Sequence, residues 1–140
     1  MKIKGIVEED FVNFNKPSML LLMPSCNWKC GQGLCQNSSM AKARNIDAIP
    51  KQIALRYANN PITKALIFSG LEPMLSFEDV VEMIVEFRKV SEDEVVIYTG
   101  YTEEEVKHKI KYLQENFKNI IVKFGRYTPD EEVHCDSILG

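Results

Sequence analysis

The sequence predicts an α/β protein whose mostly parallel sheet, with flanking helices on its outer side, forms an incomplete (β/α) barrel. Four short apolar segments have the composition of buried strands, and they lie at residues 18–23, 65–68, 95–98 and 120–124. Helical patterns alternate with these segments, as in βαβ units with right-handed crossovers. A closed (β/α)₈ barrel needs at least about 200 residues. A chain of 140 residues is too short for a complete one.

The first two helical segments follow the first two predicted strands. One begins at Asp47 or Pro50 and stops at residues 59–61, where two asparagines and a proline end the pattern. The other starts at Ser76, and residues 76–79 resemble a capping box. Its apolar residues recur with the 3.6-residue period of an amphipathic helix.

The third helical segment begins at Thr102, with Glu105 three positions later. Acidic residues fill its first turn, where the helix dipole favours negative charge. At the other end of the chain, residues 3–14 predict a further strand pair or an edge hairpin. We find no internal repeat or linker, and we therefore expect a single domain over residues 1–140.

The composition is that of an ordinary globular domain, with 45% hydrophobic and 26% charged residues. Seventeen Lys and Arg against 20 Asp and Glu leave a net charge of −3, so no basic surface remains to hold a nucleic acid. The longest apolar segment, residues 19–23, is far shorter than the ~20 residues that cross a bilayer. The N-terminus lacks the apolar core of a secretion signal. We expect a cytoplasmic protein with no nucleic-acid or membrane partner.

Three of the four cysteines, Cys26, Cys30 and Cys35, lie within ten residues in the loop after the first predicted strand. Such clustering in a chain without an export signal indicates thiolates gathered around a metal rather than a disulfide framework. Three thiolates leave one iron of a cubane cluster, or one position on zinc, without a protein ligand. Neither C-x₃-C nor C-x₄-C is the C-x₂-C pair of zinc folds. The spacing therefore favours an iron–sulfur cluster over zinc and over inert buried thiols.

The loops after the other strands carry further polar residues and glycines. Parallel sheets bind their ligands at the carboxyl ends of the strands, so we expect these loops to share one rim. Glu72 offers a carboxylate to the ammonium group of an amino-acid ligand, and Gly70 lets the main chain approach that ligand. The alternative for this segment is a plain turn before the helix. Thr99 adds a hydroxyl, and Arg126 follows the last strand.

Taken together, these motifs resemble the radical S-adenosylmethionine superfamily. There, a C-x₃-C-x₂-C loop after the first strand binds a 4Fe–4S cluster whose open iron binds the methionine end of S-adenosylmethionine. The chain is similar to the small members that activate anaerobic (class III) ribonucleotide reductase. Its segments 35–38, 68–73, 97–101 and 125–127 resemble, in the family's order, Cys-His-Asn, Gly-Gly-Glu-Pro, Tyr-Thr-Gly-Tyr and Gly-Arg-Phe. Four residues rather than two separate the last two cysteines. The segment 69–71 must also be shifted by one position to align with the two glycines of Gly-Gly-Glu-Pro.

The resemblance implies a set of site residues. Cys26, Cys30 and Cys35 would bind the cluster, with no catalytic residue beyond these ligands. The residues implied to bind S-adenosylmethionine are Leu34 (near the adenine), Asn37, Ser69, Gly70, Glu72 and Thr99. The family's small members continue beyond the position of Gly140, so two alternatives stay open for the C-terminus: a truncated chain or a short natural variant.

The resemblance also implies an oxidoreductase activity. The enzyme would reductively cleave S-adenosylmethionine to a 5′-deoxyadenosyl radical and generate a glycyl radical on a large anaerobic ribonucleotide reductase subunit. An electron donor such as flavodoxin would be its other partner. Two alternatives stay open: a small radical S-adenosylmethionine enzyme with another substrate, and a zinc or iron–sulfur interaction module without catalysis. Cys135 and Arg126 receive no role.

Overall fold

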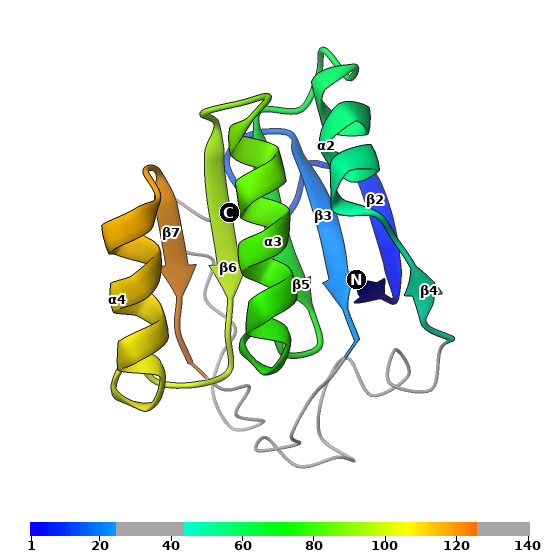
Figure 1. Cartoon of the computed structure of the whole chain (residues 1–140). Helices are drawn as coiled ribbons and strands as arrows, with labels where there is room; N and C mark the ends of the chain where they lie inside the picture. Colours follow the sequence, from blue (N-terminus) through cyan, green and yellow to red (C-terminus); the bar gives the residue numbers. More distant parts are fainter. Residues whose placement is uncertain (25–43, 126–140) are drawn as a thin grey trace.

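The computed structural model describes residues 1–24 and 44–125 of the chain. These residues contain a five-stranded sheet of order β2-β3-β5-β6-β7 (Figure 1). Its strands are β2 (Gly5–Asp10), β3 (Ser18–Met23), β5 (Ala65–Gly70), β6 (Glu94–Tyr98) and β7 (Ile120–Lys123). The last four run parallel to one another, and β2 pairs antiparallel with β3. The predicted mostly parallel α/β sheet is therefore confirmed.

The N-terminal segment pairs differently from a hairpin. Strand β1 (Lys2–Ile3) pairs antiparallel with β4 (Ile46–Asp47), whereas β2 pairs with β3 at the edge of the main sheet. An edge strand in residues 3–14 is thus confirmed, but a hairpin within them is wrong. Because Ile46 and Asp47 belong to a strand, the first helix cannot begin at Asp47.

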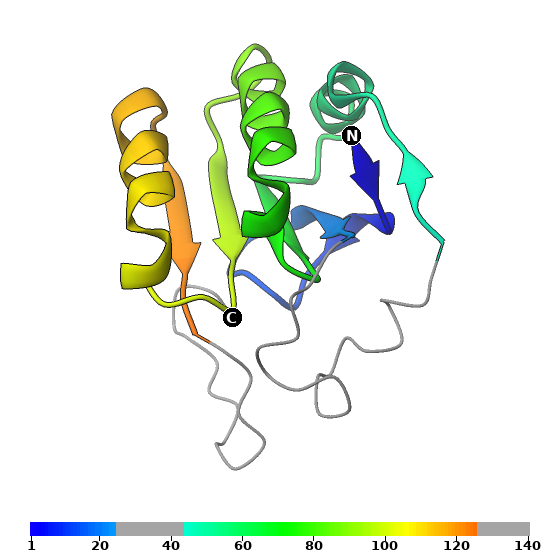
Figure 2. The same ribbon diagram turned by 60° about the horizontal axis from the view of Figure 1, so that its bottom comes forward.

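Three helices connect the parallel strands in the described residues. They are α2 (Pro50–Ala58), α3 (Phe77–Arg88) and α4 (Lys107–Asn116). All three lie on the same face of the sheet (Figure 2), as right-handed crossovers require when the strands follow one another in sequence order. The sheet is open in this part of the chain, with β2 and β7 as its edges, so an incomplete barrel stays a prediction. No described helix is long and apolar enough to span a membrane.

The capping box predicted at residues 76–79 and the Thr102–Glu105 pair have different outcomes. The Thr102 amide donates to Glu105 Oε1 at 2.9 Å, and the Glu105 amide donates to Thr102 Oγ1 at 3.4 Å. This reciprocal pair precedes the short 3₁₀ helix η2 (Glu104–Val106) and α4. Ser76, by contrast, caps nothing with its side chain. The 3₁₀ helix η1 (Pro73–Ser76) runs directly into α3, so the chain is already coiled before the α-helix begins.

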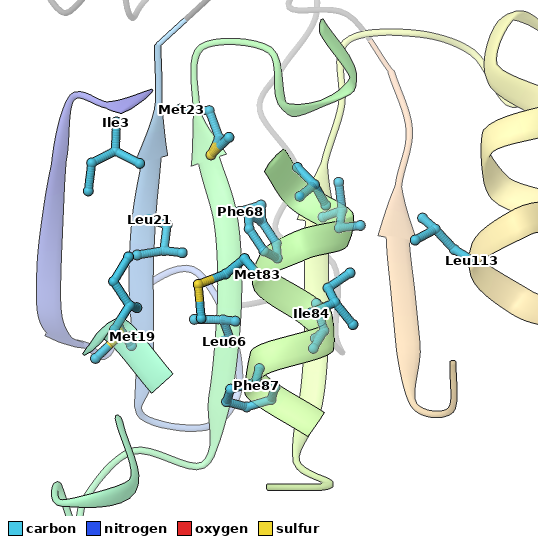
Figure 3. Packing of buried hydrophobic residues seen from close by; sticks show 14 of the residues in the cluster. Ile3, Met19, Leu21, Met23, Leu66, Phe68, Met83, Ile84, Phe87 and Leu113 are labelled. Atoms are coloured by element: carbon cyan, nitrogen blue, oxygen red, sulfur yellow. The ribbon is translucent and has the colours of Figure 1, made fainter. Parts of the chain in front are cut away.

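The main core lies between the sheet and the helices α2, α3 and α4. Its fully buried side chains include Met19 and Leu21 of β3, Leu66 and Phe68 of β5, and Met83, Ile84 and Phe87 of α3 (Figure 3). The alternate strand residues Leu20, Ile67 and Val96 join a second cluster. Burial of both sets explains why these strands are almost continuously apolar. Each large aliphatic side chain removed from water contributes about 1.5–3 kcal/mol, which anchors the strand ends that carry the site.

Polar side chains fix the amino end of β6. Arg88 donates to the carbonyl oxygens of Asp93 at 2.7 Å and Lys118 at 2.6 Å, so the end of α3 is tied to the segments that enter β6 and β7. The Tyr57 hydroxyl donates to the Asp93 carboxylate at 2.7 Å. This network is a structural anchor at the sheet edge opposite to the carboxyl ends of the strands.

The Tyr57 hydroxyl gives a testable pH dependence. Burial, and then the hydrogen bond to Asp93, raise the pKa of Tyr57 far above its usual value of 10.0. The unfolded chain loses this proton near that value while the folded chain keeps it, so stability falls as the pH rises above it. We expect Tyr57→Phe to be about 1 kcal/mol less stable than the wild type at neutral pH.

That difference should shrink above pH about 10, where the tyrosine in the wild type contributes a loss of up to ~1.4 kcal/mol per pH unit. Urea unfolding of both proteins over a pH series measures it. Parallel stability curves for the two proteins throughout the alkaline range would contradict the assigned pKa shift of Tyr57.

Candidate functional site

The candidate site residues that the structure describes lie at the carboxyl ends of the parallel strands, the lower edge of the sheet in Figure 1. Ser69 and Gly70 end β5, Glu72 follows in the β5–α3 turn, and Thr99 follows β6. The segment with the three clustered cysteines begins after β3, at the same edge. The structure therefore brings the described members of the predicted rim together.

The other predicted site residues fall outside the described part of the chain. These are Cys26, Cys30 and Cys35, the proposed neighbours Leu34 and Asn37, and the unassigned Arg126 and Cys135. Within residues 1–24 and 44–125, no group of three or more His, Cys, Asp or Glu side chains is arranged to hold a metal ion. The metal prediction therefore depends on the cysteine segment itself.

Gly70 brings the end of β5 into contact with the end of β3. Its φ of +83° lies in the region that favours glycine, and a Cβ there would stand 2.8 Å from the amide nitrogen of Met23 and 2.9 Å from Cα of Leu22. The Leu71 amide donates to the carbonyl oxygen of Met23 at 3.2 Å. The β5–α3 turn is thus fastened to the strand end that precedes Cys26 by three positions.

The carboxylate of Glu72 joins two turns of the rim. Glu72 is only 5% exposed. Its Oε2 accepts from the amide of Met74 at 3.0 Å and from the Thr99 hydroxyl at 2.8 Å. Its Oε1 accepts from the amide of Gly100 at 2.7 Å. One side chain therefore holds the β5–α3 turn against the β6–α4 turn.

Thr99 continues this network toward β7. Its hydroxyl donates to Glu72 and accepts from the Tyr101 amide at 3.1 Å. Its own amide donates to the carbonyl oxygen of Lys123 at 2.9 Å, and the Gly125 amide donates to that of Tyr101 at 3.3 Å. The ends of all four parallel strands are thus linked by hydrogen bonds around the edge.

Lys109 also holds the β5–α3 turn in place, a role that the sequence analysis does not predict. Its Nζ donates to the carbonyl oxygen of Met74 at 2.8 Å and lies 5.7 Å from the centre of the Phe77 ring. The backbone of Met74 is therefore held by Glu72 on one side and by α4 on the other. A lysine in the first turn of a helix opposes the helix dipole, and this unusual placement is the available sequence signal.

The comparison with protein families decides the class of the cysteine site. Residues 18–136 match the family model described as a 4Fe-4S single cluster domain. The chain belongs to the 4Fe-4S single cluster domain family. The match includes all four cysteines and every rim residue named above. No curated protein and no solved structure shows significant similarity to the chain.

Membership of the 4Fe-4S single cluster domain family confirms the prediction of an iron–sulfur domain. The donor set fits this family, because thiolates are the usual protein ligands of 4Fe–4S clusters and three cysteines lie within ten residues of sequence. Which cysteines bind the cluster stays a prediction. The described rim adds a glycine and hydrogen-bonded turns at the edge where β3, the strand before the cysteine segment, ends.

Proposed function

We propose that this 4Fe-4S single cluster domain is a radical S-adenosylmethionine enzyme that generates a glycyl radical on a large anaerobic ribonucleotide reductase subunit. The main support for this proposal is the distribution of cysteines within a single-cluster domain. A cubane held entirely by protein takes four cysteines. Here three lie within ten residues, and Cys135 lies 100 positions after Cys35. Three ligands leave one iron open to a small molecule.

In this proposal Cys26, Cys30 and Cys35 hold the cluster. When bound, the cluster supplies the electron that cleaves S-adenosylmethionine into methionine and the 5′-deoxyadenosyl radical. The protein binds and orients the substrate and excludes water from it. An electron donor such as flavodoxin supplies the electron to the cluster.

The rim offers contacts for the amino-acid end of S-adenosylmethionine. An ionised carboxylate has about four acceptor positions, and three donors from the protein occupy three of those of Glu72. The remaining position, on Oε1, accepts one N–H of the ligand's ammonium group. Ser69, Gly70 and Thr99 line the same edge, and Leu34 and Asn37 complete the proposed contacts from the cysteine segment.

A large protein substrate agrees with the open form of the sheet. Strands β2 and β7 are its two edges in the described residues and do not pair with each other. The rim can therefore be approached from the side by a macromolecule carrying the target glycine. The final hydrogen abstraction transfers a hydrogen atom from that glycine to the 5′-deoxyadenosyl radical, which gives 5′-deoxyadenosine and the glycyl radical.

Anaerobic reconstitution tests the proposal. The full chain is loaded with iron and sulfide, reduced with dithionite, and mixed with S-adenosylmethionine and the large reductase subunit. We expect 5′-deoxyadenosine by chromatography and a glycyl-radical signal by electron paramagnetic resonance, neither of which forms without dithionite. A loaded cluster that releases no 5′-deoxyadenosine would support a non-catalytic module. Release without the glycyl signal would assign a different substrate.

A further inference from the structure

The Glu72 carboxylate accepts three hydrogen bonds, all from donors of the protein itself. A carboxylate that is 5% exposed needs such donors, because burying a charge without hydrogen bonds is costly. The structure assigns Glu72 a positioning role: its carboxylate locks the β5–α3 turn to the β6–α4 turn and forms the rim before a ligand arrives. We call the bonds of Glu72 to Met74, Thr99 and Gly100 the rim lock.

The donors show that the rim lock fixes backbone positions. Two of the three are backbone amides, those of Met74 and Gly100, and hydrogen bonds to an ionised acceptor are stronger than those between neutral groups. The third donor, the Thr99 hydroxyl, is itself held by the Tyr101 amide. The carboxylate therefore fixes the paths of both turns.

The rim lock also connects to the strand that leads into the cysteine segment. The tight approach of Gly70 to Met23 fastens the β5–α3 turn to the end of β3. Lys109 holds the same turn from α4 through the carbonyl oxygen of Met74. Glu72 therefore lies in the middle of a hydrogen-bonded path that runs from β3 to α4.

A rim that is ordered in advance lowers the cost of binding, since fewer groups must be immobilised when the ligand arrives. The consequence for S-adenosylmethionine rests on the function proposed above. The rim lock itself rests only on the described hydrogen bonds, and it is measured without ligand or turnover.

Hydrogen exchange of the Met74 and Gly100 amides in the full chain, without S-adenosylmethionine, tests the rim lock. In Glu72→Gln one acceptor oxygen becomes an amide group that faces donors, so we expect both amides to exchange at least about fivefold faster. Glu78→Gln makes the same charge change at an exposed position of α3 and should exchange like the wild type. Unchanged exchange of Met74 and Gly100 in a folded Glu72→Gln would overturn the assignment.

Thr99 variants decide the question if Glu72→Gln does not fold. Thr99→Val removes the hydroxyl that donates to Glu72, whereas Thr99→Ser keeps it. We expect Val to speed exchange of the Gly100 amide several-fold and Ser to restore it to within about twofold of the wild type. Equal exchange in the Val and Ser variants would overturn the rim lock.

Steady-state kinetics then separate a preformed rim from a general loss of structure. Thr99→Val should raise KM for S-adenosylmethionine about fivefold with kcat within about twofold, and Thr99→Ser should recover the wild-type KM. A loss confined to kcat would contradict preorganisation. If exchange changes as expected but no variant, including the wild type, cleaves S-adenosylmethionine, the rim lock stands and the proposed function fails.

Discussion

Replacing Cys30 with alanine is expected to abolish both cluster assembly and cleavage of S-adenosylmethionine. Cys30 is the middle member of the three clustered cysteines. Its loss leaves two thiolates in this segment, and a cubane with one open iron needs three. Iron and acid-labile sulfide are measured after anaerobic reconstitution. We expect about four of each per chain in the wild type and only a small fraction of that amount in Cys30→Ala.

Cys135→Ala is the matched control for this experiment. Cys135 has the same chemistry but lies outside the clustered segment, so the variant should retain the full iron content and the release of 5′-deoxyadenosine. Loss of the cluster in Cys135→Ala would mean four cysteine ligands and no open iron. Retention of the cluster and of cleavage in Cys30→Ala would refute the ligand assignment.

Replacing Gly70 with alanine is expected to destabilise the fold by about 2–5 kcal/mol. The positive φ costs an L-residue about 1–2 kcal/mol, and forcing a Cβ to within 2.8 Å of the Met23 amide nitrogen adds an overpacking cost of about 1–3 kcal/mol. The atoms that it meets are backbone atoms, which cannot turn aside as a flexible side chain does. Urea unfolding measures the loss.

Gly125→Ala separates the two contributions. Gly125 also has a positive φ, of +122°, but a Cβ there would meet nothing within 4 Å. This variant should show the backbone strain alone, about 1–2 kcal/mol, and Gly70→Ala should be clearly the less stable of the two. Equal losses would show that β5 does not approach β3 as closely as described.

The parallel strands were predictable because burial on both faces makes their sequences nearly continuously apolar, as in residues 18–23. The β1–β4 pair was not, because strands of two residues carry no periodic pattern and their partners lie more than forty positions apart in sequence. Local rules also failed at Ser76. The Thr102 and Ser76 segments carry similar capping patterns, but only the first forms the hydrogen bonds. Ser76 is already the last residue of η1, whereas Thr102 lies before η2.

The gathering of the rim residues followed from topology, but the bonding of Glu72 did not. Parallel strands place their carboxyl ends together whatever side chains they carry, so Glu72 and Thr99 were expected at one edge. Their direct hydrogen bond joins residues 27 positions apart and depends on the register of β5 and β6. The sequence predicts that Glu72 binds a ligand. The structure adds three hydrogen-bond donors from the protein itself, which the order of residues in the sequence does not reveal.

Contact between the open iron and S-adenosylmethionine is the claim on which the proposed activity depends. Electron–nuclear double resonance of the reduced, reconstituted protein with S-adenosylmethionine labelled with ¹⁵N at its amino group measures that contact directly. We expect a ¹⁵N hyperfine coupling between the cluster and the labelled nitrogen, which is replaced by a ¹⁴N coupling when unlabelled S-adenosylmethionine is used. An intact reduced cluster whose spectrum shows no such coupling and does not change on addition of S-adenosylmethionine would contradict the proposed activity.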